Sequence, residues 1–371
     1  MVDLQSQYIK IQPQIEKAVN EVFASAAFIN GPEVKQFQAD LEEYLHIKHV
    51  IPCANGTDAL QIAMMGLGLK QGDEVITVDF TFAATVEVIA LLNLTPVLVD
   101  VEINTFNMDI DALKKAITPK TKAIVPVHLF GQCANMEAVL EVAKEHDLYV
   151  IEDNAQAIGA DYIFKDGTRQ KAGTMGTVGI TSFFPSKNLG CFGDGGAIFT
   201  NDDALAHTIR GIVNHGMYKR YYHEVVGVNS RLDSVQAAIL RIKLPLLDGY
   251  CDARRSAAEY YNHRFSVSDK IITPVTSKFT THVFHQYTLR LKNVDRNSLH
   301  EHLNENNIPN AIYYPVPLHL QKAYKNARYH EDDFKVTNEL IDTVLSLPMH
   351  TEFEEGQQDL IIDTILNFVN K

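Results

Sequence analysis

Short apolar runs alternate with amphipathic stretches between about residue 50 and residue 205. Strands that are apolar on both faces and separated by helices are typical of a mostly parallel sheet. The runs with the length and β-branched content of strands are Val75–Val78, Pro96–Val101, Ala123–Leu129, Leu148–Asp153, Gly179–Phe184 and Ala197–Thr200. The stretches with helical spacing are Thr57–Met65, Ala84–Leu92, Ile110–Ile117, Met136–His146 and Asp203–Val213. The pattern therefore predicts an α/β domain.

The strand–helix rhythm ends near Leu247, which predicts a large domain over residues 1–247 and a smaller α+β domain over residues 248–371. A few strands are expected in the second part, including Gln286–Leu291. An amphipathic helix over Ile11–Ala24 cannot be assigned to either domain from the pattern, and packing on the small domain is left open. The helices expected in the second part are Asp252–Phe265, Arg296–Asn306, Lys335–Ser346 and Glu355–Asn370.

Composition narrows the class of protein. The formal net charge of −13 argues against general nucleic-acid binding, although a small anionic ligand needs only local donors. No apolar run approaches the roughly 20 residues of a membrane span, and the first residues do not resemble a signal peptide. The 4 cysteines are widely spaced without a CxxC pair, so neither disulfides nor a metal site is expected. A cytoplasmic protein is the simplest expectation.

Lys187 lies between an apolar strand-like run and a glycine-rich segment. A lysine at the end of a buried strand loses hydration, which favours its neutral, nucleophilic form. Such an amine could form a Schiff base with an aldehyde cofactor. Taken alone, an ordinary surface lysine is the commoner interpretation.

Five further positions make a catalytic role for Lys187 more plausible. Gly56 and Thr57 open a helix whose free N–H groups suit an anion, although plain N-capping is equally plausible. Asp153 ends a strand, where a carboxylate could hold a pyridine nitrogen protonated or simply cap a helix. Ser182 could contact a phosphate or be a satisfied strand serine, and Phe82 could stack on a planar ring or belong to the core. Together with the lysine, this set predicts a site for pyridoxal 5′-phosphate (PLP).

Six segments resemble the DegT/DnrJ/EryC1/StrS family of PLP-dependent nucleotide-sugar aminotransferases. The resemblance implies PLP-dependent transferase fold type I, with a large, mostly parallel seven-stranded sheet domain and a smaller C-terminal domain. It also implies a homodimer with the active site at the subunit interface. The segments are Gly31–Val34, Gly72–Ile76, Glu152–Gln156, Ser182–Gly196, Asn229–Asp233 and Tyr313–His319.

The resemblance also assigns roles to single residues. Lys187 resembles the lysine that holds the cofactor, and Asp153 resembles the carboxylate on its pyridine nitrogen. Gly56, Thr57 and Ser182 match phosphate contacts. The remaining matches are Gln156 near the ring hydroxyl, Phe82 on the ring face, Asn229 from the other subunit, and Tyr314 and His319 in the sugar-nucleotide pocket.

The substrate follows only from the resemblance. It implies that L-glutamate donates an amino group that a nucleotide-linked keto sugar then accepts. Arg231, with Lys219 and Arg220, is expected to supply positive charge for the diphosphate, although a solvated surface role for Lys219 and Arg220 is equally plausible. The resemblance is greatest to the branch aminating C3 of UDP-2-acetamido-2-deoxy-3-oxo-D-glucuronate for lipopolysaccharide O-antigen. The segments that carry it are Ser182–Asp194, His285–Thr288 and Tyr314–His319. A dTDP-3-oxo-6-deoxyhexose or a 4-oxo sugar is the alternative substrate.

Two alternatives belong to other classes of function. A catalytically inactive regulatory protein could share the same fold, because fold does not establish function. A nicotinamide oxidoreductase is discounted, because the only near match to its glycine motif, at 66–72, has the wrong spacing and follows a helix.

Overall fold

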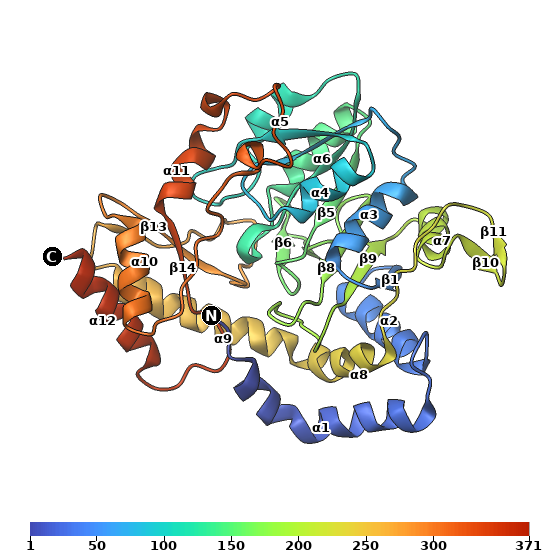
Figure 1. Cartoon of the computed structure of the whole chain (residues 1–371), viewed down its shortest axis with the longest axis horizontal. Coiled ribbons are helices and arrows are strands. Elements are labelled where there is room, and N and C mark those ends of the chain that lie inside the picture. Colours follow the sequence, from blue (N-terminus) through green and yellow to red (C-terminus); the bar gives the residue numbers. More distant parts are fainter. Residues whose placement is uncertain (371) are drawn as a thin grey trace.

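A seven-stranded sheet forms the centre of the computed structural model, which describes residues 1–370 (Figure 1). The strand order is β1-β9-β8-β5-β4-β2-β3, and only β9 runs antiparallel to its neighbours. The strands are β1 (His49–Cys53), β2 (Glu74–Val78), β3 (Thr95–Val99), β4 (Thr121–Val125), β5 (Tyr149–Asp153), β8 (Val178–Ser182) and β9 (Gly196–Thr200). The mostly parallel sheet predicted from the sequence is confirmed, and β1 is the strand that the pattern missed.

Helices cover both faces of this sheet because its strands are apolar on both sides. Val75 belongs to one buried cluster and Ile76 to another, as the alternation of side chains along a strand requires. The first cluster is completed by α3 (Gly56–Gly66), α4 (Ala84–Leu91) and α7 (Asp203–Ile212). The second is completed by α2 (Pro32–Leu45), α5 (Ile110–Ala116), α6 (Met136–Glu145) and α8 (Ser234–Lys243).

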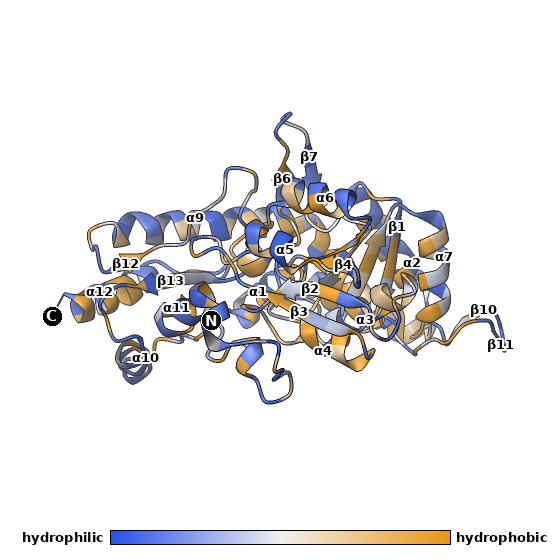
Figure 2. Cartoon of the chain, turned by 90° about the horizontal axis from the view of Figure 1, so that it is seen from above, coloured by the Kyte–Doolittle hydropathy of each residue, from blue (hydrophilic) through white to orange (hydrophobic). Residues whose placement is uncertain are grey.

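The C-terminal part has a buried cluster of its own around a three-stranded antiparallel sheet (Figure 2). One prediction was wrong here, because the helix expected over Lys335–Ser346 ends at Thr343. The residues that follow form β14, which pairs with β13. The elements are α9 (Leu247–Phe265), β12 (Ile271–Ile272), β13 (Tyr287–Leu291), α10 (Arg296–Glu305), α11 (Lys335–Thr343), β14 (Val344–Leu347) and α12 (Gln357–Val369).

Helix α9 joins the two parts of the chain. Its first turns place Leu247 and Cys251 in the core of the large sheet, whereas its later turns place Tyr261 and Phe265 in the C-terminal cluster. The division expected after residue 247 coincides with the start of this helix and stays a prediction.

The N-terminal helix α1 (Leu4–Ser25) is longer than predicted and packs mainly on α8, through Ile11, Ile15 and Ile239. The backbone carbonyl of Met1 also accepts a hydrogen bond from the N–H of Met349, so the N-terminus contacts the C-terminal part as well.

The hairpin β10–β11 projects from one end of the molecule in Figure 2. Within residues 1–370, none of the helices combines the length and apolarity needed to cross a bilayer. The remaining short elements are β6 (Asp161–Ile163), β7 (Arg169–Lys171), β10 (Met217–Lys219), β11 (Tyr222–His223) and the 3-10 turns Leu129–Gly131, Leu244–Leu246, Leu318–Leu320 and Glu331–Asp333.

Candidate active site

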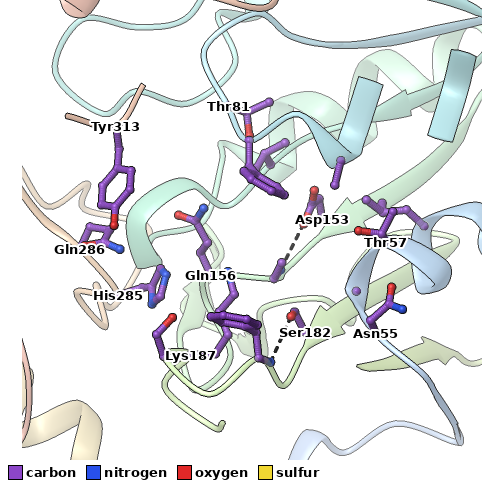
Figure 3. A pocket seen from close by; sticks show the side chains of 18 of the residues that line it. Asn55, Thr57, Thr81, Asp153, Gln156, Ser182, Lys187, His285, Gln286 and Tyr313 are labelled. Carbon is purple, nitrogen blue, oxygen red and sulfur yellow. Dashed lines mark hydrogen bonds between the residues drawn. The ribbon is translucent and has the colours of Figure 1, made fainter. Parts of the chain in front are cut away.

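A cavity of about 620 Å³ opens where the carboxyl ends of β5 and β8 meet the start of α3. Ligands of open α/β sheets usually bind at this edge. Figure 3 shows Asn55 and Thr57 at one end of the cavity and Gln286 and Tyr313 at the other, with Gln156 between them. Eight of the residues predicted from the sequence line it: Gly56, Thr57, Phe82, Asp153, Gln156, Ser182, Lys187 and Tyr314.

Lys187 lies five residues beyond the end of β8, in the turn that leads to the glycine-rich segment. Its backbone N–H donates to the carbonyl of Phe184 at 2.8 Å, which closes this turn. Burial lowers the pKa of the amine to about 8, although the negative charge of Asp153 acts in the opposite direction. The side chain therefore has an appreciable neutral, nucleophilic fraction near neutral pH.

Asp153 is held firmly at the end of β5. Its backbone N–H donates to the carbonyl of Pro126 at 3.0 Å, and its own carbonyl accepts from the N–H of His128 at 3.0 Å. The carboxylate accepts from the hydroxyl of Thr85 at 2.8 Å and from the N–H of Ala155 at 3.2 Å. Thr85, the second residue of α4, was missed from the sequence because only the packing of α4 on the sheet brings it here.

The neighbouring carboxylate, Glu152, points away from the cavity and braces the same strand end. It is fully buried and accepts three backbone N–H bonds, at 2.9, 2.5 and 2.5 Å, from the turn Gly173–Gly176. The Nε2 atom of His128 lies 2.9 Å from Glu152. Because the Nδ1 atom of His128 accepts from the N–H of Ala134 at 3.1 Å, Nε2 carries the proton and donates it to Glu152.

The start of α3 packs tightly against the end of β8. A Cβ atom on Gly56 would lie 2.8 Å from the Cβ of Ser182, so a side chain at this position would separate the two elements. Asn55 caps the helix by accepting from the N–H of Asp58 at 2.8 Å. The side chain of Thr57 lines the cavity beside these N–H groups. A helix N-terminus flanked by hydroxyl groups is suited to a phosphate.

Three further side chains, Gln156, Tyr314 and Phe82, line the cavity. The amide oxygen of Gln156 accepts from the N–H of Phe130 at 2.8 Å, and its amide nitrogen donates to the hydroxyl of Tyr314 at 3.2 Å. The ring of Phe82 lies 6.4 Å from that of Tyr314, yet 57% of Phe82 is exposed. Phe82 is therefore not a core residue, and one face of its ring is available for stacking.

His319 does not line the cavity, although the sequence predicts a contact with the sugar nucleotide. It is buried, with its Nδ1 atom 2.7 Å from a carboxylate oxygen of Asp79, and its ring stacks on Phe334. Burial raises the pKa of Asp79 to about 6, against the opposing influence of His319. The predicted substrate contact of His319 stays a prediction.

The other predicted substrate and partner residues lie outside the cavity of their own chain. Asn229 forms a bridge with Asn214, and Arg231 lies beside His215, with 3.5 Å between their nearest nitrogen atoms. The side chains of Lys219 and Arg220 lie over tyrosine rings of the β10–β11 hairpin. Within one chain, the predicted cofactor contacts except Asn229 therefore lie together in the cavity, whereas the cationic groups lie outside it.

His285 is a cavity residue to which sequence reasoning gave no role. It is buried, its Nδ1 atom has no hydrogen-bond partner within residues 1–370, and the ring lies near Lys187 (Figure 3). Burial, together with the positive charges of Lys187 and Arg254, holds the pKa of His285 well below its usual range. The imidazole is therefore neutral and can act only as a hydrogen-bonding group. The sequence marks His285 only as the first residue of the segment His285–Thr288, which carries part of the family resemblance, and this gives the side chain no role.

The residues of the cavity fit PLP. They provide a partly neutral amine, an anchored carboxylate, a helix N-terminus beside two hydroxyl groups and an aromatic ring with a free face. Across the described part of the chain, no group of three or more His, Cys, Asp or Glu side chains is arranged to hold a metal ion. All 4 cysteines are buried and unpaired.

Comparison with known proteins gives matches along nearly the whole chain. Residues 10–366 match the DegT/DnrJ/EryC1/StrS aminotransferase family. The chain is 46% identical to the pleiotropic regulatory protein of Geobacillus stearothermophilus, over 99% of this chain and 98% of that protein. It is 43% identical to the UDP-2-acetamido-2-deoxy-3-oxo-D-glucuronate aminotransferase of Pseudomonas aeruginosa, over 99% of each.

Solved structures agree with the sequence matches. The crystal structure of a DegT/DnrJ/EryC1/StrS aminotransferase from Brucella abortus has a TM-score of 0.94 and 40% identity, covering 100% of this chain and 99% of the other. NtdA from Bacillus subtilis, solved with bound cofactor PMP, has a TM-score of 0.89 and 30% identity, covering 98% of this chain and 82% of the other. The expected transferase fold is therefore confirmed.

Proposed function

The chain belongs to the DegT/DnrJ/EryC1/StrS aminotransferase family, and from this membership we propose that it moves the amino group of L-glutamate onto a nucleotide-linked keto sugar. It is a sugar aminotransferase, and its cofactor is PLP. The observation that carries the proposal is the meeting of Lys187 and Asp153 in one cavity with a helix N-terminus. These groups are what a PLP-dependent transamination requires.

Bound PLP supplies an aldehyde that takes up an amino group and a ring that delocalises negative charge. We assign its covalent attachment to the Nζ atom of Lys187. When it is not bound to the cofactor, this atom would accept the proton from the donor's α-carbon and deliver it to the cofactor carbon that carries the transferred nitrogen. The pKa of about 8 suits both directions of transfer near neutral pH.

The other cavity residues bind and orient the cofactor. We assign the carboxylate of Asp153, which accepts a hydrogen bond from Thr85, to the ring nitrogen, which it would keep protonated. The N-terminus of α3, with Thr57 and Ser182, is assigned to the phosphate. Phe82 would cover one face of the ring, and Gln156 is assigned to the ring hydroxyl.

For the acceptor we propose UDP-2-acetamido-2-deoxy-3-oxo-D-glucuronate, aminated at C3 and destined for a surface polysaccharide such as O-antigen. The similarity to the Pseudomonas enzyme, over 99% of both chains, supports this choice. We further propose a homodimer in which Asn229, Arg231 and the exposed β10–β11 hairpin complete the partner's site, since these groups lie away from their own cavity. The cytoplasm remains the expected compartment.

The test loads the enzyme with pyridoxamine phosphate and presents one keto sugar at a time. The panel contains the proposed UDP-linked uronate, its counterpart without the carboxylate and a dTDP-3-oxo-6-deoxyhexose. Return of the PLP absorption, with the amino sugar identified by mass spectrometry, is expected to be fastest with the uronate. A faster return with another sugar would replace the proposed acceptor.

The same assay addresses the regulatory alternative, which the name of the Geobacillus relative brings forward. An intact Lys187–Asp153 site argues for catalysis. Absence of turnover with L-glutamate and with every sugar, in a preparation that binds PLP, would favour a regulatory function. Lys187→Ala is the control, because it removes the amine while leaving the rest of the cavity in place.

A further inference from the structure

Lys243, the last residue of α8, is a buried lysine to which the proposed mechanism gives no role. Only 1% of it is exposed, and its ammonium donates to the backbone carbonyl of Gly190 at 2.6 Å. Within residues 1–370 it has no carboxylate partner. Burying a lysine without a carboxylate is costly, and an apolar side chain would fill the space without that penalty. The hydrogen bond to the carbonyl of Gly190 is therefore what an apolar side chain at this position could not provide.

That carbonyl belongs to the loop 187–194, which carries Lys187 at one end and Asp194 at the other, both on the cavity. The loop turns sharply, because a Cβ atom on Gly190 would lie 2.3 Å from the carbonyl oxygen of Pro185. Its backbone returns to β8 through the N–H of Cys191, which donates to the carbonyl of Phe183 at 2.8 Å. A displacement of the loop would therefore move the attachment point of the Lys187 side chain.

Helix α8 forms hydrogen bonds with the same loop at a second point. The amide of Gln236 accepts from the N–H of Phe192 at 2.9 Å and donates to its carbonyl at 3.4 Å. Gln236 and Lys243 are seven residues apart, which is about two turns and places both on one face of the helix. The ammonium of Lys243 also lies 5.5 Å from the centre of the Phe192 ring. We call this pair, Gln236 and Lys243, the α8 clamp.

We propose that Lys243 is a positioning residue. Together with Gln236 it holds the backbone of loop 187–194 against α8, and so sets the position of the Lys187 amine in the cavity. This inference rests on the proposed function, because the residue that the clamp positions is the lysine proposed to bind PLP. Neither clamp residue lines the cavity, so they act through the loop backbone and not through contact with cofactor or substrate.

The test uses Lys243→Met, which keeps a long side chain but removes the donor, and Gln236→Met, which removes the second grip at a half-buried position. In the PLP-loaded enzyme, the pH midpoint of the visible absorption depends on the charges around the Lys187 amine. We expect that midpoint to move by about 0.5 pH unit or more in either variant. We also expect kcat to fall about tenfold with little change in KM, because a displaced reacting group slows chemistry more than binding.

Leu299→Ala in α10 is the matched control, since it opens a cavity in the C-terminal cluster, away from the loop. It should lower the unfolding temperature without moving the absorption midpoint or kcat. The positioning role is overturned if both clamp variants keep the wild-type midpoint and a kcat within about twofold, or if the control shifts the midpoint as they do. Should Lys243→Met fail to fold, Gln236→Met decides. The absorption titration needs no sugar, so a wrong choice of acceptor would not change its outcome.

Discussion

Lys187 is expected to capture PLP as an amine that titrates near pH 8 when cofactor is added back to the apoenzyme. Burial lowers its pKa from 10.5 to about 8. At pH 7 about one such amine in ten is neutral, against about one in 3,000 for an ordinary lysine. If only the neutral amine attacks the aldehyde, covalent capture at pH 7 should be about 300-fold faster than at an exposed lysine.

The assay is stopped-flow absorbance of PLP at a series of pH values, followed by borohydride reduction and peptide mass spectrometry. The rate should rise about tenfold per pH unit below pH 8 and level off above it. Lys187→Ala should show no fast phase and no label in the peptide that contains residue 187. A rate that keeps rising to about pH 10, or a label at another lysine, would refute the reasoning.

The substitution Asp153→Asn tests the direction in which the charge of Asp153 shifts the pKa of Lys187. Its negative charge raises the pKa of Lys187 against the effect of burial. Asp153→Asn should therefore lower the midpoint of capture below that of the wild type and speed capture at pH 7. The same variant should slow transamination, because the ring nitrogen loses its carboxylate. A midpoint that moves upward would show that the charge of Asp153 does not reach the amine.

Three further substitutions test the surroundings of this pair. Gly56→Ala should weaken PLP binding about tenfold or more in an equilibrium titration, because the new Cβ would lie 2.8 Å from the Cβ of Ser182. Thr85→Val should slow the glutamate half-reaction about tenfold at nearly constant shape, because Asp153 loses a hydroxyl donor at 2.8 Å, and an unchanged rate would remove Thr85 from the site. Glu152→Gln should lower the free energy of unfolding by about 3 kcal/mol in urea titrations, because a buried acceptor of three backbone N–H groups is disrupted.

The sequence predicts Lys187 and Asp153 better than the residues that other parts of the chain bring to them. Lys187 and Asp153 both follow strands, and the carboxyl ends of neighbouring parallel strands meet at one edge of a sheet. Their meeting therefore follows from local pattern and general topology. Thr85 contacts Asp153 from a helix start, and His285 lines the cavity from the C-terminal part, so the positions of both depend on packing that no local pattern encodes.

The errors in the fold have the same origin. The residues of β14 continue an apolar stretch at the end of α11, so local periodicity extends the helix through Ser346. Pairing with β13 selects the strand instead. Strand β1 has the polar His49 at one end and Pro52 near the other, which leaves a short apolar run and weakens the signal of a strand. In both cases the neighbouring strand decides the structure.

Helix α9 has a consequence for how the molecule unfolds. Because one uninterrupted helix supplies Leu247 and Cys251 to the large core and Tyr261 and Phe265 to the C-terminal cluster, neither core can lose its part of the helix without exposing the edge of the other. Helix formation is cooperative, so loss of helical structure at one end of α9 destabilises the other end. The two clusters should therefore melt together, as a single calorimetric transition, despite the separate sheets on which they are built.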